Sequence, residues 1–344
     1  MVARVITITE QDFTRWDNYV RAHKQGSFFH LSGWMSVISK SFSHPCYYLM
    51  AEDDKQVLGI LPLVEVKSAL FGHALISTPF CVYGGAIADN DDVLRELESH
   101  AKQLSESLQV DYLELRYRHA QNNGLLLKQQ HSTFGCELAE DSEKILANVK
   151  KKQRAVIRHS LKNELQHQVT QDIDQFYQLL SESYRNLGTP IFSKQYFEHL
   201  INEFSQHADI LIVSDSEGNP SNAVMNFYFN DQVLPYYGGG NSAARAIKSA
   251  DYMYYQVMCH ANENKASKWY DFGRSKHDSG PYKYKKNWGM APEPLHYYYH
   301  LVNAKELPNL SPNNPKYKVF INLWQKLPLK VSQYLGPFLS KYLG

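Results

Sequence analysis

The chain has 344 residues, of which 43% are hydrophobic and 21% are charged. This is the composition of an ordinary globular protein, and the length suits two domains of about 150 residues each. Its 36 basic and 35 acidic residues nearly cancel, which argues against a dedicated DNA- or RNA-binding protein. The sequence shows no leader-like apolar run at the N-terminus and no run of about 20 apolar residues, so we expect a cytoplasmic protein.

The four cysteines, Cys46, Cys81, Cys136 and Cys259, lie far apart in the sequence. None belongs to a C-x-x-C pair, the spacing typical of zinc sites and redox centres. Thiols in the cytoplasm stay reduced, so we expect free cysteines rather than disulfides. We therefore expect no metal site. We also expect no tightly bound cofactor.

The first part of the chain alternates helical and strand patterns. Apolar residues recur with helical spacing or in short runs separated by polar, turn-like segments. The last predicted strand before the third helix ends in the tetrapeptide VYGG, at residues 82–85. In chain order, the pattern predicts helices over 12–24 and 27–42, a hairpin over 47–67, a strand over 73–85, a helix over 90–108 and a strand over 110–118.

The same order of elements recurs from residue 172 onward. The fourth element again ends in glycines, in the run YYGGG at 236–240, and the spacing from Gly84 to Arg116 resembles that from Gly238 to Arg274. Agreement in order and spacing is the signature of an old internal repeat. The second series comprises helices over 172–188 and 189–204, a hairpin over 208–229, a strand over 231–240, a helix over 246–265 and a strand over 268–276.

This order resembles that of the Gcn5-related N-acetyltransferase (GNAT) fold. We therefore expect an α/β (α+β) protein with two tandem GNAT-like acyltransferase domains, mixed and splayed sheets, and an amphipathic helical tail. The expected divisions are a first domain at 1–140, a basic linker helix at 141–171, a second domain with the active site at 172–305 and a basic tail at 306–344.

In each half the glycines fall where a strand meets the start of a helix. Glycine lets a ligand approach the backbone, and the free N–H groups of a helix start attract a phosphate or a developing oxyanion. Pro235 cannot donate to a neighbouring strand, so it predicts an edge, bulge or splay in the sheet. Ordinary turns and core packing are the alternative. The predicted substrate contacts are Gly238, Gly239, Tyr236, Tyr237 and, in the first half, Tyr83.

Residues 271–290 combine cations with aromatic side chains. Their glycines and proline predict a loop at the carboxyl edge of the sheet, which suits a phosphate, a sugar or a nucleic-acid end. A solvated basic loop would have the same composition. Asp271 is expected to pair with a nearby cation or to accept a proton. The predicted substrate contacts here are Arg274, Ser275, Lys276, Lys283 and Trp288.

Two further segments are basic. Residues 150–162 contain no acid, and Arg154 and Arg158 share a helix face, so they could clamp a pyrophosphate or merely face solvent. Residues 317–344 form an apolar face interrupted by Pro328, among lysines. This tail could lie on an anionic membrane, giving peripheral contact with the inner membrane, or could dock on the protein.

Five stretches together resemble a known family: LISTPFCVYGG, YRNLGTP, LPYYGGG, DFGRSK and YKYKKNWG. They resemble the FemAB-like proteins associated with exosortase and PEP-CTERM systems, found beside exopolysaccharide genes of Gram-negative bacteria. The resemblance covers about residues 27–340. The wider relatives, the Fem aminoacyltransferases, look like tandem GNAT folds and move an amino acid from aminoacyl-tRNA onto an amine of a peptidoglycan precursor.

The family's aromatic-Lys-x-x-aromatic-Gly motif aligns with residues 284–289, so the resemblance implies that Lys285 holds the acyl carbonyl or its oxyanion. It implies transfer of an acyl or aminoacyl group to an amine of a cell-surface polysaccharide or lipid-linked saccharide precursor. The helical arm used beside tRNA and the acetyl-CoA loop motif lack clear counterparts, so aminoacyl-tRNA and acyl-CoA both stay open as donors. The alternative function is a non-catalytic scaffold protein of polysaccharide export.

Overall fold

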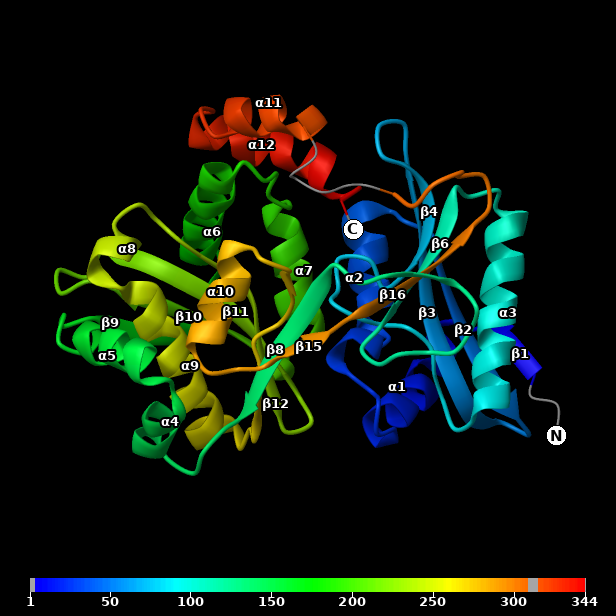
Figure 1. Cartoon of the computed structure of the whole chain (residues 1–344), viewed down its shortest axis with the longest axis horizontal. Coiled ribbons are helices and arrows are strands. Elements are labelled where there is room, and N and C mark those ends of the chain that lie inside the picture. The colour runs from blue at the N-terminus through cyan, green and yellow to red at the C-terminus, as the bar shows by residue number, and fades with distance from the viewer. Residues whose placement is uncertain (1–3, 309–314, 344) are drawn as a thin grey trace. The chain divides into compact units, whose positions relative to one another are not determined.

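The computed structural model describes residues 4–308 and 315–343, and the chain forms two compact units (Figure 1). The first unit holds the described residues of 1–131, 294–309 and 341–344, and the second holds those of 132–293 and 310–340. Neither unit is contiguous in sequence, which differs from the contiguous division that the sequence predicts.

The first unit is built on one mixed sheet with the strand order β1-β2-β3-β4-β6-β16-β7 and β5 beside β3. Helices cover both faces. Tyr48 packs against Trp16 of α1, while its neighbour Leu49 belongs to the cluster that contains Leu97 of α3. The strands are β1 (Arg4–Thr7), β2 (Cys46–Asp53), β3 (Gln56–Ser68), β4 (Gly72–Ser77), β5 (Ile87–Ala88), β6 (Tyr112–Tyr117), β7 (Leu126–Lys128) and β16 (His296–Leu301), and the helices are α1 (Phe13–Ala22), α2 (Gly33–Phe42) and α3 (Asp91–Ser107).

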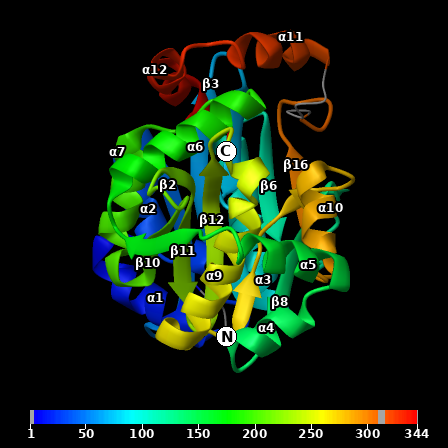
Figure 2. The same ribbon diagram turned by 90° about the vertical axis from the view of Figure 1, so that its left-hand side faces the viewer.

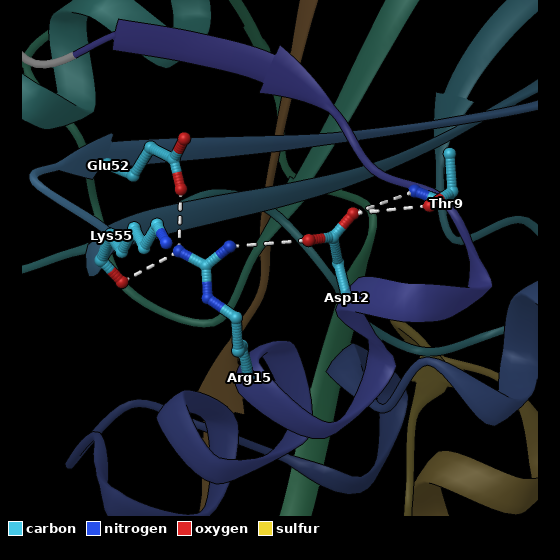
Figure 3. Close-up of polar contacts among 5 residues, drawn as sticks. All are labelled: Thr9, Asp12, Arg15, Glu52 and Lys55. Carbon is cyan, nitrogen blue, oxygen red and sulfur yellow. Dashed lines mark hydrogen bonds and ion pairs between the residues drawn. The ribbon is translucent and has the colours of Figure 1, made fainter.

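Arg15 ties α1 to the turn between β2 and β3 (Figure 3). Its guanidinium donates to the Glu52 carboxylate at 2.5 Å and to the Lys55 carbonyl at 2.7 Å. It also donates to Asp12 at 3.3 Å, and Asp12 in turn accepts from the backbone N–H of Thr9. One planar side chain with several N–H donors thus satisfies groups from three segments.

The second unit repeats the plan, with the strand order β14-β8-β13-β12-β11-β10-β9 and β15 beside β8. Its strands are β8 (His131–Glu137), β9 (Gln166–Thr170), β10 (Ala208–Ser214), β11 (Pro220–Phe229), β12 (Gln232–Gly240), β13 (Trp269–Asp271), β14 (Ser275–Lys276) and β15 (Pro292–Pro294). Its helices are α4 (Ser142–Asn148), α5 (Lys151–Ser160), α6 (Ile173–Leu187), α7 (Lys194–Glu203), α8 (Ala244–Ile247), α9 (Ser249–Lys265), α10 (Gly280–Asn287), α11 (Pro315–Trp324) and α12 (Leu329–Ser340).

An exchange of strands explains why the units are not contiguous. In the first unit β4 and β6 are parallel, and β16, from the far end of the chain, adds antiparallel to β6 (Figure 1). In the second unit β12 and β13 are parallel, and β8, which follows the first repeat, adds antiparallel to β13. The equivalent position of each sheet is therefore filled by the strand that continues the other repeat.

Local sequence signals account for several helix ends. The side chain of Asn90 accepts from the Val93 N–H and caps α3, and Asp172 caps α6 in the same way. Gly188 ends α6 with a φ of +75°, a conformation in which glycine avoids the clash of a Cβ atom. The predicted order of helix, helix, hairpin, strand, helix and strand is present in both units.

Four predicted elements differ from the structure. The strand expected over 73–85 ends at Ser77, and residues 82–85 lie in the following loop. The strand expected over 268–276 is broken between β13 and β14, where Gly273 has a φ of +70°. The loop expected over 271–290 contains α10, because the Ser279 hydroxyl caps its first turn and a proline occupies that turn. Within 141–171, β9 pairs with β10.

The described part of the predicted tail consists of α11 and α12, while residues 309–314 and 344 lie outside the described residues. Within the described part of the chain, no helix is long and apolar enough to cross a membrane.

Candidate functional site

The strands β12 and β13 separate soon after they meet. Their parallel pairing is limited to Gln232 with Trp269 and Val233 with Tyr270, whereas β12 continues along β11 to Gly240. Pro235 lies at a bulge, because Tyr237 pairs with Met225 and Pro235 with Asn226, which leaves Tyr236 as the extra residue. The irregularity predicted from Pro235 is confirmed, and the sheet opens beyond it.

The glycines of β12 let helices approach both faces of the sheet. A Cβ atom at Gly238 would meet the Tyr254 hydroxyl of α9 at 3.0 Å. At Gly239 it would meet the Ser183 Cβ of α6 at 2.7 Å, closer than real Cβ atoms come. The two helices thus pack on opposite faces of β12 (Figure 2). Close packing of these helices is by itself a reason for glycine at both positions.

Lys285 lies where β13 ends. Its ammonium donates to the carbonyl oxygens of Gly273 and Arg274, each at 3.0 Å. The same group lies 5.1 Å from the centre of the Phe272 ring, within the range of a cation–π contact. An ammonium has three N–H donors, so one of them lacks a hydrogen-bond acceptor among the described residues. That donor is available to a substrate oxygen.

Burial lowers the pKa of Lys285 from 10.5 to about 8. The negative charge of Asp271 works in the opposite direction, and the nearby Arg274 guanidinium adds to the lowering. At neutral pH most Lys285 side chains still carry their charge, and the half-buried position of this residue weakens the screening of that charge by water.

Asp271 is the last residue of β13 and is buried. Its Oδ1 atom accepts from the Gly273 N–H at 2.8 Å and from the Thr133 hydroxyl of β8 at 3.3 Å. Gly273 connects the two predicted catalytic side chains, because its N–H donates to Asp271 and its carbonyl oxygen accepts from Lys285. A buried carboxylate beside an ammonium can hold that charge in place or accept a proton.

Ser275 adds an unsatisfied group to this cluster. Its side chain is 5% exposed, and its hydroxyl has no hydrogen-bond partner among the described residues. The adjacent Arg274 and Lys276 are half-buried, while Lys283 is exposed on α10. A buried hydroxyl without a partner is costly, and a bound ligand would relieve that cost. We name the group Thr133, Asp271, Ser275 and Lys285 the lysine cluster.

An aromatic wall connects the glycines of β12 with α10. Tyr254, which faces Gly238, packs edge-on against Phe272 at 4.7 Å between ring centres and contacts Trp288 at 6.4 Å. Trp288 also contacts Tyr284 at 6.2 Å. Residues 271–290 therefore reach the same face of β12 as Gly238, as the predicted slot requires.

Arg154 and Arg158 lie one turn apart on α5 and line a surface hollow of about 590 Å³. The other lining residues are Lys151, Ala155, His159 and Lys162. Cations with no acid among them favour a phosphate-bearing ligand. We name this surface the basic hollow.

Asp251 of α9 connects the basic hollow's helix with the helix of Lys285. Its Oδ1 accepts from the Gln153 amide of α5 at 2.6 Å and from the Tyr284 hydroxyl of α10 at 2.9 Å. In addition, the Lys150 ammonium donates to the Lys286 carbonyl at 3.0 Å. These contacts hold α5 beside α10.

The predicted aromatic contacts are mostly packed already. The Tyr237 hydroxyl hydrogen-bonds that of Tyr196 in α7 at 2.8 Å, and Tyr236 is half-buried against Phe227. Trp288 is buried and lines a second hollow of about 300 Å³ with Met258 and Met290. Tyr83 belongs to the first unit, where it is buried against Phe29. Substrate contact through these rings stays a prediction.

The first unit uses its glycines differently. The N–H groups of Gly84 and Gly85 both donate to the Arg116 carbonyl of β6, at 3.0 and 2.8 Å. The loop that carries them thus covers the end of β6. Arg116, the counterpart of Arg274, is buried, pairs with Glu114 at 2.7 Å and donates to the Cys81 carbonyl. In the first unit, backbone N–H groups donate to the carbonyl oxygen of Arg116, whereas in the second unit the Lys285 ammonium donates to that of Arg274.

Local sequence signals do not identify two members of the arrangement. Thr133 lies 138 residues before Asp271 and reaches it only because β8 joins the second sheet. Asp251 lies in the first turn of α9, where acidic residues are common, so its sequence position does not mark it as special. Its role as a joint acceptor for α5 and α10 depends on packing.

Comparison with known proteins identifies the second unit. Residues 144–286 match the acetyltransferase (GNAT) domain family. A comparison with curated proteins finds no match. The matched residues include the basic hollow, the strands β12 and β13, and Lys285. The prediction that the chain is an acyltransferase is confirmed.

Solved structures share the fold over most of the chain. FemX is 15% identical with a TM-score of 0.67, over 92% of this chain and 100% of that one. A tandem GNAT protein from the clavulanic acid biosynthesis pathway, solved without AcCoA, is 10% identical with a TM-score of 0.56, over 88% and 100%. The C-terminal domain of a putative lysylphosphatidylglycerol synthetase from Agrobacterium fabrum is 11% identical with a TM-score of 0.57, over 86% and 92%. The predicted tandem GNAT-like fold is confirmed.

Proposed function

We propose that the chain is a FemAB-like N-acyltransferase that moves an acyl or aminoacyl group onto an amine of a cell-surface polysaccharide or lipid-linked precursor, in an exopolysaccharide and exosortase system. The observation that carries the proposal is Lys285, an ammonium held by two carbonyls at the parting strands, with one N–H donor left over. The likeness to FemX supports the tandem fold that the proposal requires.

In the proposed reaction the amine nitrogen attacks the activated carbonyl carbon, and the carbonyl oxygen becomes an oxyanion. The remaining N–H donor of Lys285 stabilises that oxyanion, since a fixed cation in a poorly hydrated site needs little reorganisation. Asp271 accepts the proton that the amine loses. The C–N bond has then formed, and collapse of the oxyanion restores the carbonyl and breaks the bond to the leaving group. The departing thiolate or ribose oxygen takes up the proton from Asp271.

The basic hollow binds the phosphates of the donor in this proposal. Both acyl-CoA and aminoacyl-tRNA present phosphates, so Arg154 and Arg158 suit either, and no tightly bound cofactor is needed. The tandem GNAT relative that was solved without AcCoA suggests a CoA donor. The resemblance of the sequence to the Fem aminoacyltransferases suggests an aminoacyl donor instead. The acceptor is a saccharide amine, either free or lipid-linked, and DNA has no part.

The test uses the purified chain with two donors, labelled acetyl-CoA and a labelled aminoacyl-tRNA pool, and a panel of amino sugars and lipid-linked amino sugars. Transfer from one donor class is expected. Lys285→Ala is expected to lower kcat by about 100-fold or more, as loss of one oxyanion donor does. Lys286→Ala, which removes an exposed ammonium from the same helix, is the matched control. Absence of transfer from both donors rejects the function, and full turnover by folded Lys285→Ala rejects the role of Lys285.

A further inference from the structure

The two C-terminal helices dock on the second unit through small and polar groups. On α12 the buried positions are Ser332, Gly336 and Ser340, one turn apart, and a Cβ at Gly336 would lie 2.6 Å from the Ile191 carbonyl oxygen. The helix backbone therefore lies directly on the chain that follows α6, as Figure 1 shows for the red helices beside α6.

The helix α11 is held in a similar way. Trp324 is its buried large side chain, and the Gln325 amide donates to the Asn186 carbonyl at 3.1 Å. The Arg185 guanidinium donates to the Leu327 carbonyl at 3.2 Å, in the turn between the helices. These bonds fix which side of the helix pair faces the protein.

As a result, several large apolar side chains of both helices are exposed to solvent. Tyr334 is 71% exposed, Val319 67%, Leu323 62% and Phe338 58%. Val331 and Leu335 complete the stripe on α12. A soluble surface helix normally buries such a stripe and exposes its small residues, and large apolar side chains exposed together on a surface mark an interaction site. We name the six side chains Val319, Leu323, Val331, Tyr334, Leu335 and Phe338 the apolar face.

The charged residues of the C-terminal segment have one sign. Residues 315–343 contain five lysines and neither aspartate nor glutamate. Three of these lysines, Lys318, Lys326 and Lys330, are exposed on or between the two helices. An apolar stripe flanked by lysines alone complements a surface that offers hydrocarbon beneath anionic groups.

We propose that the apolar face and its lysines bind the surface of a bilayer that contains anionic lipids, with α11 and α12 lying in the interface. A second copy of the chain is a poorer occupant, because a two-fold interface built on this face would bring like-charged lysines together. The proposal does not depend on the acyltransferase chemistry. It would hold the second unit at the membrane, where lipid-linked acceptors are found.

The experiment is co-sedimentation of the full chain with vesicles of phosphatidylcholine containing 30% phosphatidylglycerol, compared with pure phosphatidylcholine. We expect binding to the anionic vesicles that falls as NaCl is raised. Lys326→Gln with Lys330→Gln should weaken binding about 25-fold, from about fivefold per lysine. Leu323→Gln with Phe338→Gln should weaken it by at least about tenfold.

Matched controls lie in the first unit. Leu70, which is 77% exposed, and the exposed Lys24 are replaced by glutamine, and both variants should bind as the wild type does. All substituted side chains are exposed, and circular dichroism checks that each variant folds. Equal binding to neutral vesicles, no binding to either, or self-association in solution that Leu323→Gln with Phe338→Gln abolishes would each overturn the proposal.

Discussion

Replacing Lys285 with methionine tests the electrostatic description of the site. The wild-type ammonium has a pKa of about 8 in the folded chain and 10.5 when unfolded, with burial as the main cause. Between these two values the unfolded chain binds one more proton than the folded chain, so the contribution of Lys285 to stability rises with pH. Below about pH 8 the lysine is charged in both states, and its contribution is constant.

The size of the stability change follows from the difference of one bound proton between the unfolded and folded chains over the pH range of the experiment. From pH 7 to pH 9.5 the folded Lys285 is neutral for about 1.5 units while the unfolded one is charged, which is about 2 kcal/mol. Methionine has no such titration. The free energy of unfolding of the wild type minus that of Lys285→Met should therefore rise by about 2 kcal/mol across this range.

The assay is urea unfolding of both proteins at pH 7, 8, 9 and 9.5, followed by circular dichroism. Taking the difference removes the titration of all other groups and the constant loss of the two carbonyl contacts. Lys286→Met, an exposed neighbour on α10, is the control and should show a flat difference. A difference that stays flat or falls for Lys285→Met would show that the ammonium is not desolvated, and the oxyanion role would lose its physical basis.

Three further predictions concern activity and stability. Asp271→Asn should lower kcat by about 100-fold or more. Activity is expected to decline near pH 8 as Lys285 loses its proton, and this decline should move to lower pH in the variant because the Asp271 carboxylate raises the pKa of Lys285. An unchanged pH profile would contradict this. Arg154→Gln with Arg158→Gln should raise KM for the donor, reduce the salt dependence of that KM and leave kcat nearly unchanged, measured by steady-state kinetics at two salt concentrations. An unchanged KM would show that the donor does not bind in the basic hollow. Arg15→Gln should lower the free energy of unfolding by about 1 kcal/mol in urea, because it removes contacts to Glu52, Lys55 and Asp12; unaltered stability would mean that these contacts contribute nothing.

Local signals in the sequence were sufficient for the repeated elements. Asn90 marks the start of a helix because its side chain accepts a hydrogen bond from a backbone N–H three residues later. Gly188 marks the end of a helix because a residue without a side chain can adopt the left-handed conformation there. Pro235 predicted the bulge for a similar reason, since a missing N–H alters strand pairing at that residue. The prediction of a loop at 271–290 was wrong over α10, where the Ser279 cap outweighed the nearby glycines.

Contacts between distant residues were beyond sequence reasoning. Thr133 joins Asp271 because the strands β8 and β16 exchange between the units, and no local preference encodes which sheet edge a strand will complete. The helical period of α12 likewise predicted two faces without saying which is buried. Tertiary packing buried the face with Gly336, because its backbone can lie against Ile191, and thereby left the large apolar side chains outside.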